Sequence, residues 1–260
     1  LPRIFVKCYR EQMKRILKVT GDRRTPFLNG VMGIISAFVA GGVNAGGFLV
    51  VGQYTSHLTG IIAGASDALG LGIFFVAKWA AVFVSVFTVG AIVSAVLIQV
   101  AQGLKLHSRY ALAFLVSGGV LVVLGVASQG LMRLTPDGLL LKLALFFSMG
   151  MQNATVSRMS DFVIRATHMT GIVTDIGIEI GTWLSGVKIS ASKLAVRGGT
   201  LIAFFVGGVI GAVGMGSPWG IHTLSVLGGI LILLSLFPVV HDLRVRHRYA
   251  VRQRHRQAGI

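Results

Sequence analysis

Six apolar runs divide the chain, and each is near or above the length that a helix needs to cross a bilayer. A spanning helix requires about 20 mainly apolar residues. Of the 260 residues, 54% are hydrophobic and only 12% are charged. These features predict an all-α fold, that of a polytopic membrane protein with six transmembrane helices. The runs cover residues 27–52, 73–101, 110–131, 139–157, 198–217 and 219–241.

Two sequence patterns occur once in each half of the chain, in the same order. Gly-x-x-Asn-Ala stands at 41–45 and again at 150–154, and His-x-Thr-Gly follows at 57–60 and at 168–171. A duplicated polar motif in apolar sequence predicts two homologous halves whose functional groups gather where the halves meet. The expected units are a basic amphipathic tail, two membrane repeats and a second basic tail, over residues 1–26, 27–138, 139–241 and 242–260.

The segments that begin with the repeated histidines, residues 57–72 and 168–185, are short and polar. They are typical of broken or re-entrant helices, which are tolerated in a membrane where protein or a water-filled cavity surrounds them. If neither segment spans, each half has three crossings and the halves are inverted, which is the arrangement that we favour. If both span, the halves are parallel repeats of four helices.

Basic residues favour the inverted arrangement with both termini in the cytoplasm. The two tails carry +6 and +5 of the net charge of +16. With six crossings, the loops 102–109 and 158–197 are cytoplasmic and hold seven Lys and Arg residues, against three in the outer loops. This agrees with the positive-inside tendency, most of which an eight-crossing topology loses. We expect a multi-pass protein of the bacterial cytoplasmic (inner) membrane, with its tails against anionic lipids.

The repeated histidines and amides are the main candidates for a solute or ion pathway. An intramembrane imidazole can hold or release a proton near physiological pH, and a buried amide requires a hydrogen-bond partner. The alternative is a structural role in capping or helix packing, which is favoured for the two threonines. The predicted pathway residues are Asn44, His57, Thr59, Asn153, His168, Thr170 and Asp175, with Asp67, Gln152 and Glu179 as secondary candidates.

Three ionisable residues of the second half share one helical face. His168, Asp175 and Glu179 follow one another at spacings of seven and four residues, which places them along one side of a helix. This row predicts a proton or cation route in which Asp175 is the coupling acid. The competing interpretation is a cytoplasm-facing amphipathic helix whose acids pair with Lys188, Lys193 or Arg197.

The sequence contains no motif of an enzyme, so no catalytic residue, metal or cofactor is expected. The acidic row does not match His-Glu-x-x-His, and Cys8 is the one cysteine, which leaves no set of thiolate ligands. Neither a Gly-x-Ser-x-Gly elbow nor a phosphate-binding loop is present. Nucleic acid is not an expected partner, because the basic tails carry no recognition motif.

Two blocks of sequence carry a family resemblance. The first is Gly-x-x-Asn-Ala-Gly-Gly-Phe at 41–48 followed by Thr59-Gly60, and the second is Gly-Met-Gln-Asn-Ala at 150–154 followed by Thr170-Gly171. They resemble the YoaK-like bacterial membrane proteins, a family without an established biochemical function, over most of residues 27–241. Asn44 stands where that family carries an acidic residue, and His57 where it carries an amide. The resemblance therefore implies the architecture and does not assign ion coupling to Asn44.

These features predict a secondary transporter or channel-like permease for an unknown small solute, with proton coupling as an option. The alternative is a non-transporting membrane scaffold or regulatory protein whose polar motifs join its halves. Glycines in the run 198–217 predict close helix packing within the chain, and they raise a homodimer seam as a hypothesis.

Overall fold

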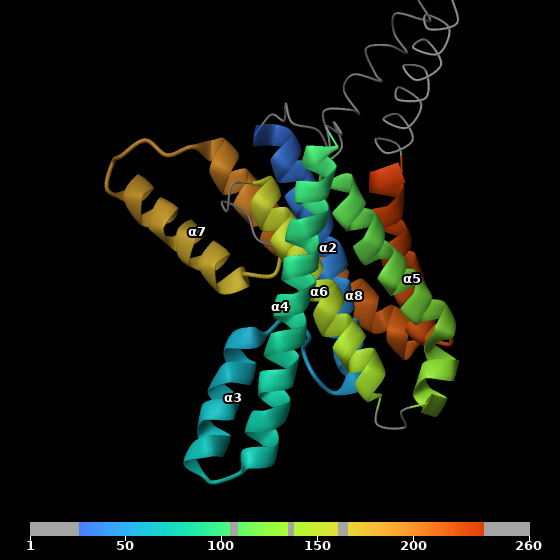
Figure 1. The fold of residues 1–260 in the computed structure, drawn as a ribbon. Coiled ribbons are helices and arrows are strands. Elements are labelled where there is room, and N and C mark those ends of the chain that lie inside the picture. Colours follow the sequence, from blue (N-terminus) through green and yellow to red (C-terminus); the bar gives the residue numbers. More distant parts are fainter. Residues whose placement is uncertain (1–25, 105–108, 135–137, 161–165, 237–260) are drawn as a thin grey trace, which may run out of the picture.

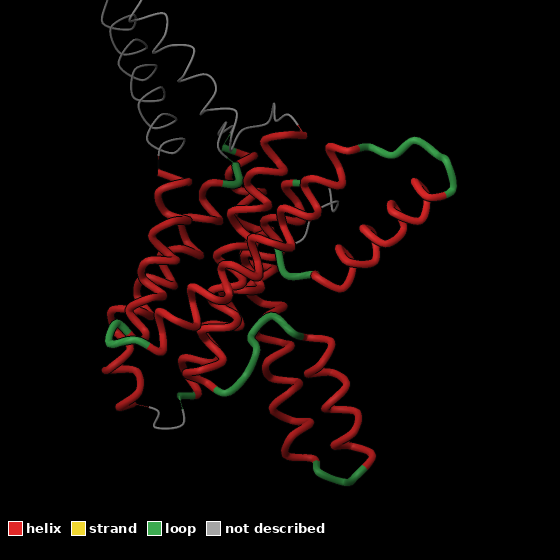
Figure 2. The backbone as a smooth tube through the Cα atoms, turned by 180° about the vertical axis from the view of Figure 1, so that it is seen from behind, coloured by secondary structure: helices red, strands yellow, loops and turns green. Residues whose placement is uncertain are grey.

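The computed structural model describes residues 26–104, 109–134, 138–160 and 166–236, and its regular elements are helices throughout these ranges (Figures 1 and 2). The all-α prediction is confirmed for this part of the chain. The basic tails lie outside it, apart from Pro26. The elements are α2 (Pro26–Val51), α3 (Leu58–Gly70), α4 (Phe74–Gly103), α5 (Ala111–Leu134), α6 (Leu139–Met159), α7 (Met169–Leu184), α8 (Ala191–Gly216), the short 3-10 helix η1 (Gly220–His222) and a last helix over residues 223–236.

Four described helices are long and apolar enough to cross a membrane. They contain Gly30–Val51, Phe74–Gly103, Leu139–Met159 and Ala191–Gly216, and they match the first, second, fourth and fifth apolar runs. The third and sixth runs also form helices, but their described apolar parts are shorter, at Ala111–Ala127 and Gly220–Leu236. The structure therefore supports a multi-pass membrane protein.

Each half of the chain packs mainly against the other half. Helix α2 lies along α8, and α4 lies along α6. Both contacts use a glycine on each helix, three residues after a phenylalanine. A side chain at any of these glycines would overlap a backbone carbonyl of the facing phenylalanine, so glycine allows the close approach. The facing pairs are Gly41 with Phe204, Gly207 with Phe38, Gly90 with Phe147, and Gly150 with Phe87.

The long helices of residues 27–138 run in the opposite direction to those at the same place in the order of residues 139–241 (Figure 1). In Figure 1, α2 descends while α6 ascends, and α4 ascends while α8 descends. Helices α3 and α7 both begin near the mid-height of the bundle, and from there α3 leads downward and α7 upward. Turns at Gly72 (φ +75°) and Gly186 (φ +80°) precede the next long helix, in a backbone conformation that favours glycine.

A buried core fills the space where α4, α5 and α6 meet. The rings of Phe83 and Phe146 stack with their centroids 4.8 Å apart. Two pairs of buried hydroxyl groups link the helices, Ser94 with Thr155 at 2.8 Å and Ser117 with Ser148 at 3.2 Å between oxygens. These bonds satisfy polar groups that the surrounding apolar side chains cannot.

The glycines of α8 serve packing within the chain. Gly207 and Gly211 lie against the backbone of α2, and a Cβ at Gly214 would meet the side chain of Thr223. The homodimer stays a prediction. Helix α8 begins at Ala191, earlier than the apolar run, because the Oγ of Ser190 accepts a hydrogen bond from the backbone N–H of Lys193 and caps the helix.

Candidate functional site

Asn44, near the end of α2, is hydrogen-bonded to the segment that leads into α3. Its Oδ1 accepts from the backbone N–H of Ser56, with 3.0 Å between the two atoms. Asn44 is half-buried, so the bond satisfies a polar group in an otherwise apolar helix. Because Ser56 directly precedes His57, this contact holds the start of α3 against α2.

The second half contains a corresponding contact. The hydroxyl of Thr167 donates to Oδ1 of Asn153 over 3.3 Å, and Thr167 directly precedes His168. Within each half the asparagine motif is thus joined to the residue before the histidine motif. Among the described residues the two asparagines do not bond to each other.

His57 and His168 immediately precede α3 and α7, in almost the same backbone conformation. Their φ and ψ angles are −92° and 60° for the first, and −91° and 61° for the second. Neither side chain caps its helix with a hydrogen bond. Each imidazole lies instead over Gly60 or Gly171, where a Cβ would overlap the ring. The glycine of each motif therefore makes room for the histidine, and both histidines are exposed at the surface of the chain.

The other predicted residues lie in two different environments. Thr59 and Thr170 are exposed in the first turns of their helices, and Asp67 is exposed on α3. Gln152 is completely buried in α6, and neither polar atom of its amide has a hydrogen-bond partner in the described part of the chain. Gln152 shares its helical face with the bonded hydroxyls of Ser148 and Thr155.

The two acids of α7 are paired with one arginine of α8. Nη2 of Arg197 lies 3.1 Å from Oδ2 of Asp175, and Nη1 of the same guanidinium bonds to Oε1 of Glu179. The competing interpretation of the acidic row named Arg197 as a partner, and this contact is present. The guanidinium therefore bridges two successive turns of α7 and fastens that helix to α8.

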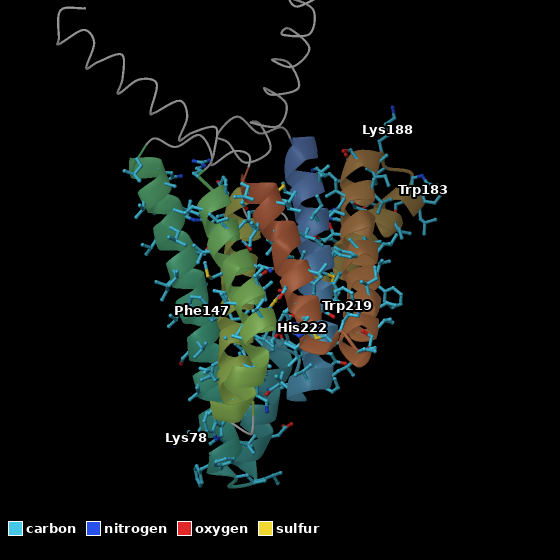
Figure 3. The ribbon with its side chains drawn as sticks, turned by 90° about the vertical axis from the view of Figure 1, so that its right-hand side faces the viewer. Lys78, Phe147, Trp183, Lys188, Trp219 and His222 are labelled. Carbon is cyan, nitrogen blue, oxygen red and sulfur yellow. The ribbon has the colours of Figure 1, made fainter. Side chains whose placement is uncertain are left out.

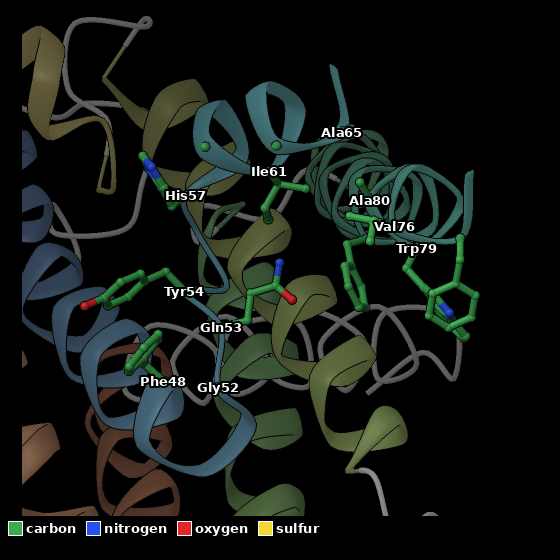
Figure 4. A pocket seen from close by; sticks show the side chains of 14 residues that line it. Phe48, Gly52, Gln53, Tyr54, His57, Ile61, Ala65, Val76, Trp79 and Ala80 are labelled. Carbon is green, nitrogen blue, oxygen red and sulfur yellow. The ribbon is translucent and has the colours of Figure 1, made fainter. Parts of the chain in front are cut away.

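A cavity of about 450 Å³ lies beside the start of α3, between the loop after α2 and the first turns of α4 (Figure 4). Its walls are aromatic, aliphatic or small side chains, and Gln53 and His57 contribute polar groups. The aromatic residues include Tyr54 and Trp79. The lining residues are Phe48, Gly52, Gln53, Tyr54, His57, Gly60, Ile61, Gly64, Ala65, Phe75, Val76, Trp79, Ala80 and Phe83.

The ion pairs of the second half have no counterpart at the matching positions of the first half. Seven residues after His168 stands Asp175, whereas seven residues after His57 stands Gly64. Arg197 stands ten residues before Gly207, the glycine of α8 that faces Phe38. Ala80 stands ten residues before Gly90, the corresponding glycine of α4. Both small residues line the cavity. The first half therefore has a cavity at positions where the second half has an ion pair.

Several residues of the site were not among the predicted ones. Ser56 and Thr167 each carry a hydroxyl directly before a repeated histidine, and this shared feature was a usable signal. Gln53 and Trp79 lack a repeated pattern, so nothing in the sequence distinguishes them from other loop and helix residues. The described residues hold no group of three or more His, Cys, Asp or Glu side chains arranged to bind a metal ion.

The described residues form helices, and four of these helices are able to span a bilayer, which defines a multi-pass membrane protein. A family model described as "protein of unknown function (DUF1275)" matches residues 32–237, which is most of the chain. The chain belongs to this family. The match supports the prediction of an uncharacterised family, while the narrower YoaK-like and bacterial resemblance stays a prediction. No curated protein and no solved structure matches the chain.

Proposed function

We propose that the chain is a membrane permease for a small solute, built from two inverted halves of three crossings each. In this proposal α2, α4 and α5 span in the first half. Helices α6, α8 and 223–236 span in the second. Helices α3 and α7 are half-helices that start inside the membrane and return to the side from which their loops entered. Secondary transporters place their binding sites where such broken helices begin.

The two matched hydrogen bonds are the observation that carries this proposal. Asn44 and Asn153 each hold the start of a half-helix, and these half-helices lead in opposite directions from mid-height (Figure 1). A backbone that is broken within hydrocarbon needs partners for its free polar groups. A protein whose motifs only join two halves does not require helices that begin at mid-depth. His57 and His168 stand at both of these starting points, so they are the central pathway residues.

The distribution of basic residues supports a topology with cytoplasmic termini in a bacterial inner membrane. Lys78 lies near one end of the bundle, and Lys188 lies near the other, together with Trp183 (Figure 3). The end that holds Lys188 carries the loops with more Lys and Arg residues, so the positive-inside tendency assigns it to the cytoplasm.

Thiol labelling tests the inverted topology directly. In a Cys8→Ser background, Leu71→Cys and Lys188→Cys each place one thiol in an exposed turn. We expect a membrane-impermeant maleimide, added to intact cells, to label Cys at 71 and to label Cys at 188 only after the cells are permeabilised. Labelling of both positions from the same side indicates parallel repeats of four helices and contradicts the inverted proposal.

Flux measurements test transport. Purified protein in lipid vesicles is offered a panel of small solutes, with and without a proton gradient. We expect saturable flux of at least one solute, reduced by His57→Ala and by His168→Ala. His222→Ala is the matched control, because His222 is exposed at the end of η1 and lies outside both motifs. An effect of the gradient supports proton coupling. A route through Asp175 must break its ion pair with Arg197.

Two results would contradict the permease proposal. A correctly folded protein that moves no solute across the panel supports the scaffold or regulatory function instead. Equal loss of flux in His57→Ala and in the His222→Ala control indicates a general effect on folding and removes the support for a histidine pathway.

A further inference from the structure

We propose that the cavity beside His57 is the solute-binding site, and that it selects small, planar, uncharged molecules with an amide-like edge. This inference rests on the proposed permease function and names the class of its substrate. Three features of the cavity carry it, namely its aromatic walls, its lack of Asp, Glu, Lys and Arg side chains, and the position of Gln53.

The walls of the cavity fit a flat apolar body. Trp79 and Phe83 lie along one side, with ring centroids 6.1 Å apart and 30° between their planes. On another side, Phe48 and Tyr54 stack at 4.4 Å. The volume of about 450 Å³ falls within the range of small-molecule sites. Aromatic walls bind planar rings by stacking and edge contacts in addition to apolar burial.

The lining contains no Asp, Glu, Lys or Arg side chain. An ionic ligand would leave its hydration shell without gaining a carboxylate, ammonium or guanidinium partner, which is unfavourable in an apolar site. Asp67 and Lys78 belong to the same two helices, yet neither lines the cavity. The cavity therefore favours an uncharged ligand over an anion or a cation of the same shape.

Gln53 supplies a polar contact with a defined geometry. Figure 4 shows its side chain directed into the space between the start of α3 and the wall that carries Trp79. Within the described residues this amide makes no hydrogen bond to the protein, and a primary amide offers a donor and an acceptor side by side. A ligand edge with an acceptor next to a donor satisfies both at once, as it does when glutamine reads adenine.

Two small residues in the wall of this cavity stand where the second half carries an ion pair. Gly64 stands at the position of the first half that corresponds to Asp175, and a Cβ built at Gly64 meets no atom within 4 Å. Ala80 likewise stands at the position that corresponds to Arg197. Both small residues line the cavity beside α3 and α4, whereas the corresponding residues of α7 and α8 form an ion pair.

Binding of three probes of equal shape and different charge tests the proposal. Benzamide is uncharged, benzoate is an anion and benzamidinium is a cation. The protein carries Trp183→Phe and Trp219→Phe, so that Trp79 is the one tryptophan, and it is held in lipid nanodiscs. We expect benzamide to change the Trp79 emission saturably, with benzoate and benzamidinium binding at least about tenfold more weakly.

Two variants locate the site. Gly64→Leu fills the cavity, and we expect it to weaken benzamide binding at least about tenfold. Gly177→Leu is the matched control, because Gly177 is a helical glycine of α7 that also has open space at its Cβ position. It should leave the benzamide affinity unchanged. Gln53→Leu should reduce the preference for benzamide over toluene, whereas Gln53→Asn should retain part of it.

Several results overturn the inference. Preferential binding of benzoate or benzamidinium assigns the cavity to a charged ligand. Absence of saturable binding by all three probes means that the cavity is not a binding site for small planar molecules. Equal effects of Gly64→Leu and Gly177→Leu place the binding elsewhere. These failures are distinguishable from failure of the permease proposal, because flux in vesicles is measured separately and a protein that transports another solute class fails the binding test alone.

Discussion

Asn44 and Ser56 are joined by a hydrogen bond of 3.0 Å between the side-chain oxygen of the first and the backbone nitrogen of the second. This bond connects the end of a long apolar helix to the residue before His57, and so holds the start of α3. Asn153 and Thr167 form the corresponding contact at the start of α7. The position of both histidines therefore depends on an amide thirteen or fifteen residues earlier in the chain.

Removing the first of these contacts tests whether it positions the half-helix. Asn44→Ala deletes the acceptor, and we expect it to lower the stability by about 1 kcal/mol and to reduce any flux more than the stability loss explains. Thermal unfolding in detergent and flux in vesicles are the two measurements. Asn44→Asp keeps an acceptor oxygen and should be closer to the wild type in both.

The second half offers a matched pair of variants. Thr167→Val removes the donor to Asn153 while nearly keeping the side-chain volume, and Thr167→Ser keeps the hydroxyl. The valine variant should resemble Asn44→Ala, and the serine variant should resemble the wild type. If Thr167→Val and Thr167→Ser have equal stability and equal flux, the hydrogen bond to Asn153 contributes to neither.

The glycines at the helix crossings lead to a prediction about stability. At Gly150 a Cβ would overlap the backbone carbonyl of Phe87, and a backbone atom cannot move aside as a side-chain end can. We expect Gly150→Ala to force α4 and α6 apart and to destabilise the protein by about 1–3 kcal/mol, measured by thermal or denaturant unfolding.

Gly119→Ala is the control for this substitution. Gly119 lies in α5, and nothing lies within 4 Å of its Cβ position. In a helix an alanine is favoured over glycine by about 0.5–1 kcal/mol, so this variant should be neutral or slightly stabilising. Similar destabilisation by both substitutions would show that close packing at Gly150 is not the cause.

The arginine on α8 should hold α7 in place. Arg197 is paired with both Asp175 and Glu179, and Glu179 is the more buried of the two acids, with 15% of its side chain exposed. We expect Arg197→Gln to destabilise the protein by about 1–3 kcal/mol, because the acids then lack their partner. Unfolding measurements and proteolysis of the turn between α7 and α8 report this change.

A double-mutant cycle separates the ion pair from other effects of the substitution. In the background of Asp175→Asn with Glu179→Gln, the arginine has lost both partners already. Arg197→Gln should then cost much less stability than it does in the wild type. Equal costs in the two backgrounds would mean that the arginine acts through other contacts.

The long helices were predictable from the sequence because each corresponds to an apolar run. The run at 73–101 became α4 (Phe74–Gly103), and the short segment after His57 became α3. Start points depended on local caps instead, as Ser190 shows for α8. The repeated Phe-x-x-Gly pattern behind the helix crossings is present in the sequence, yet two apolar residues carry little signal among many others.

The candidate site was less predictable, for physical reasons that differ between residues. The asparagines and histidines repeat, so duplication identified them. Their contacts could not be derived, because Ser56 uses its backbone and Thr167 its side chain. The cavity depends on small side chains, since it lies where Gly64 and Ala80 leave space. Small residues in apolar sequence give no indication that the space beside them is open.

The glycine of the histidine motif provides the last prediction. A Cβ at residue 60 would overlap the imidazole of His57, and that ring is a mobile side-chain end rather than backbone. Gly60→Ala should therefore displace the ring at little cost, with stability changed by less than about 1 kcal/mol, while benzamide binding or solute flux falls. Combining it with His57→Ala separates the two effects. If Gly60 acts by placing the ring, the alanine at residue 60 should cause no further loss of binding once the ring is absent. A further loss in the double variant would mean that Gly60 acts directly on the cavity, which it also lines.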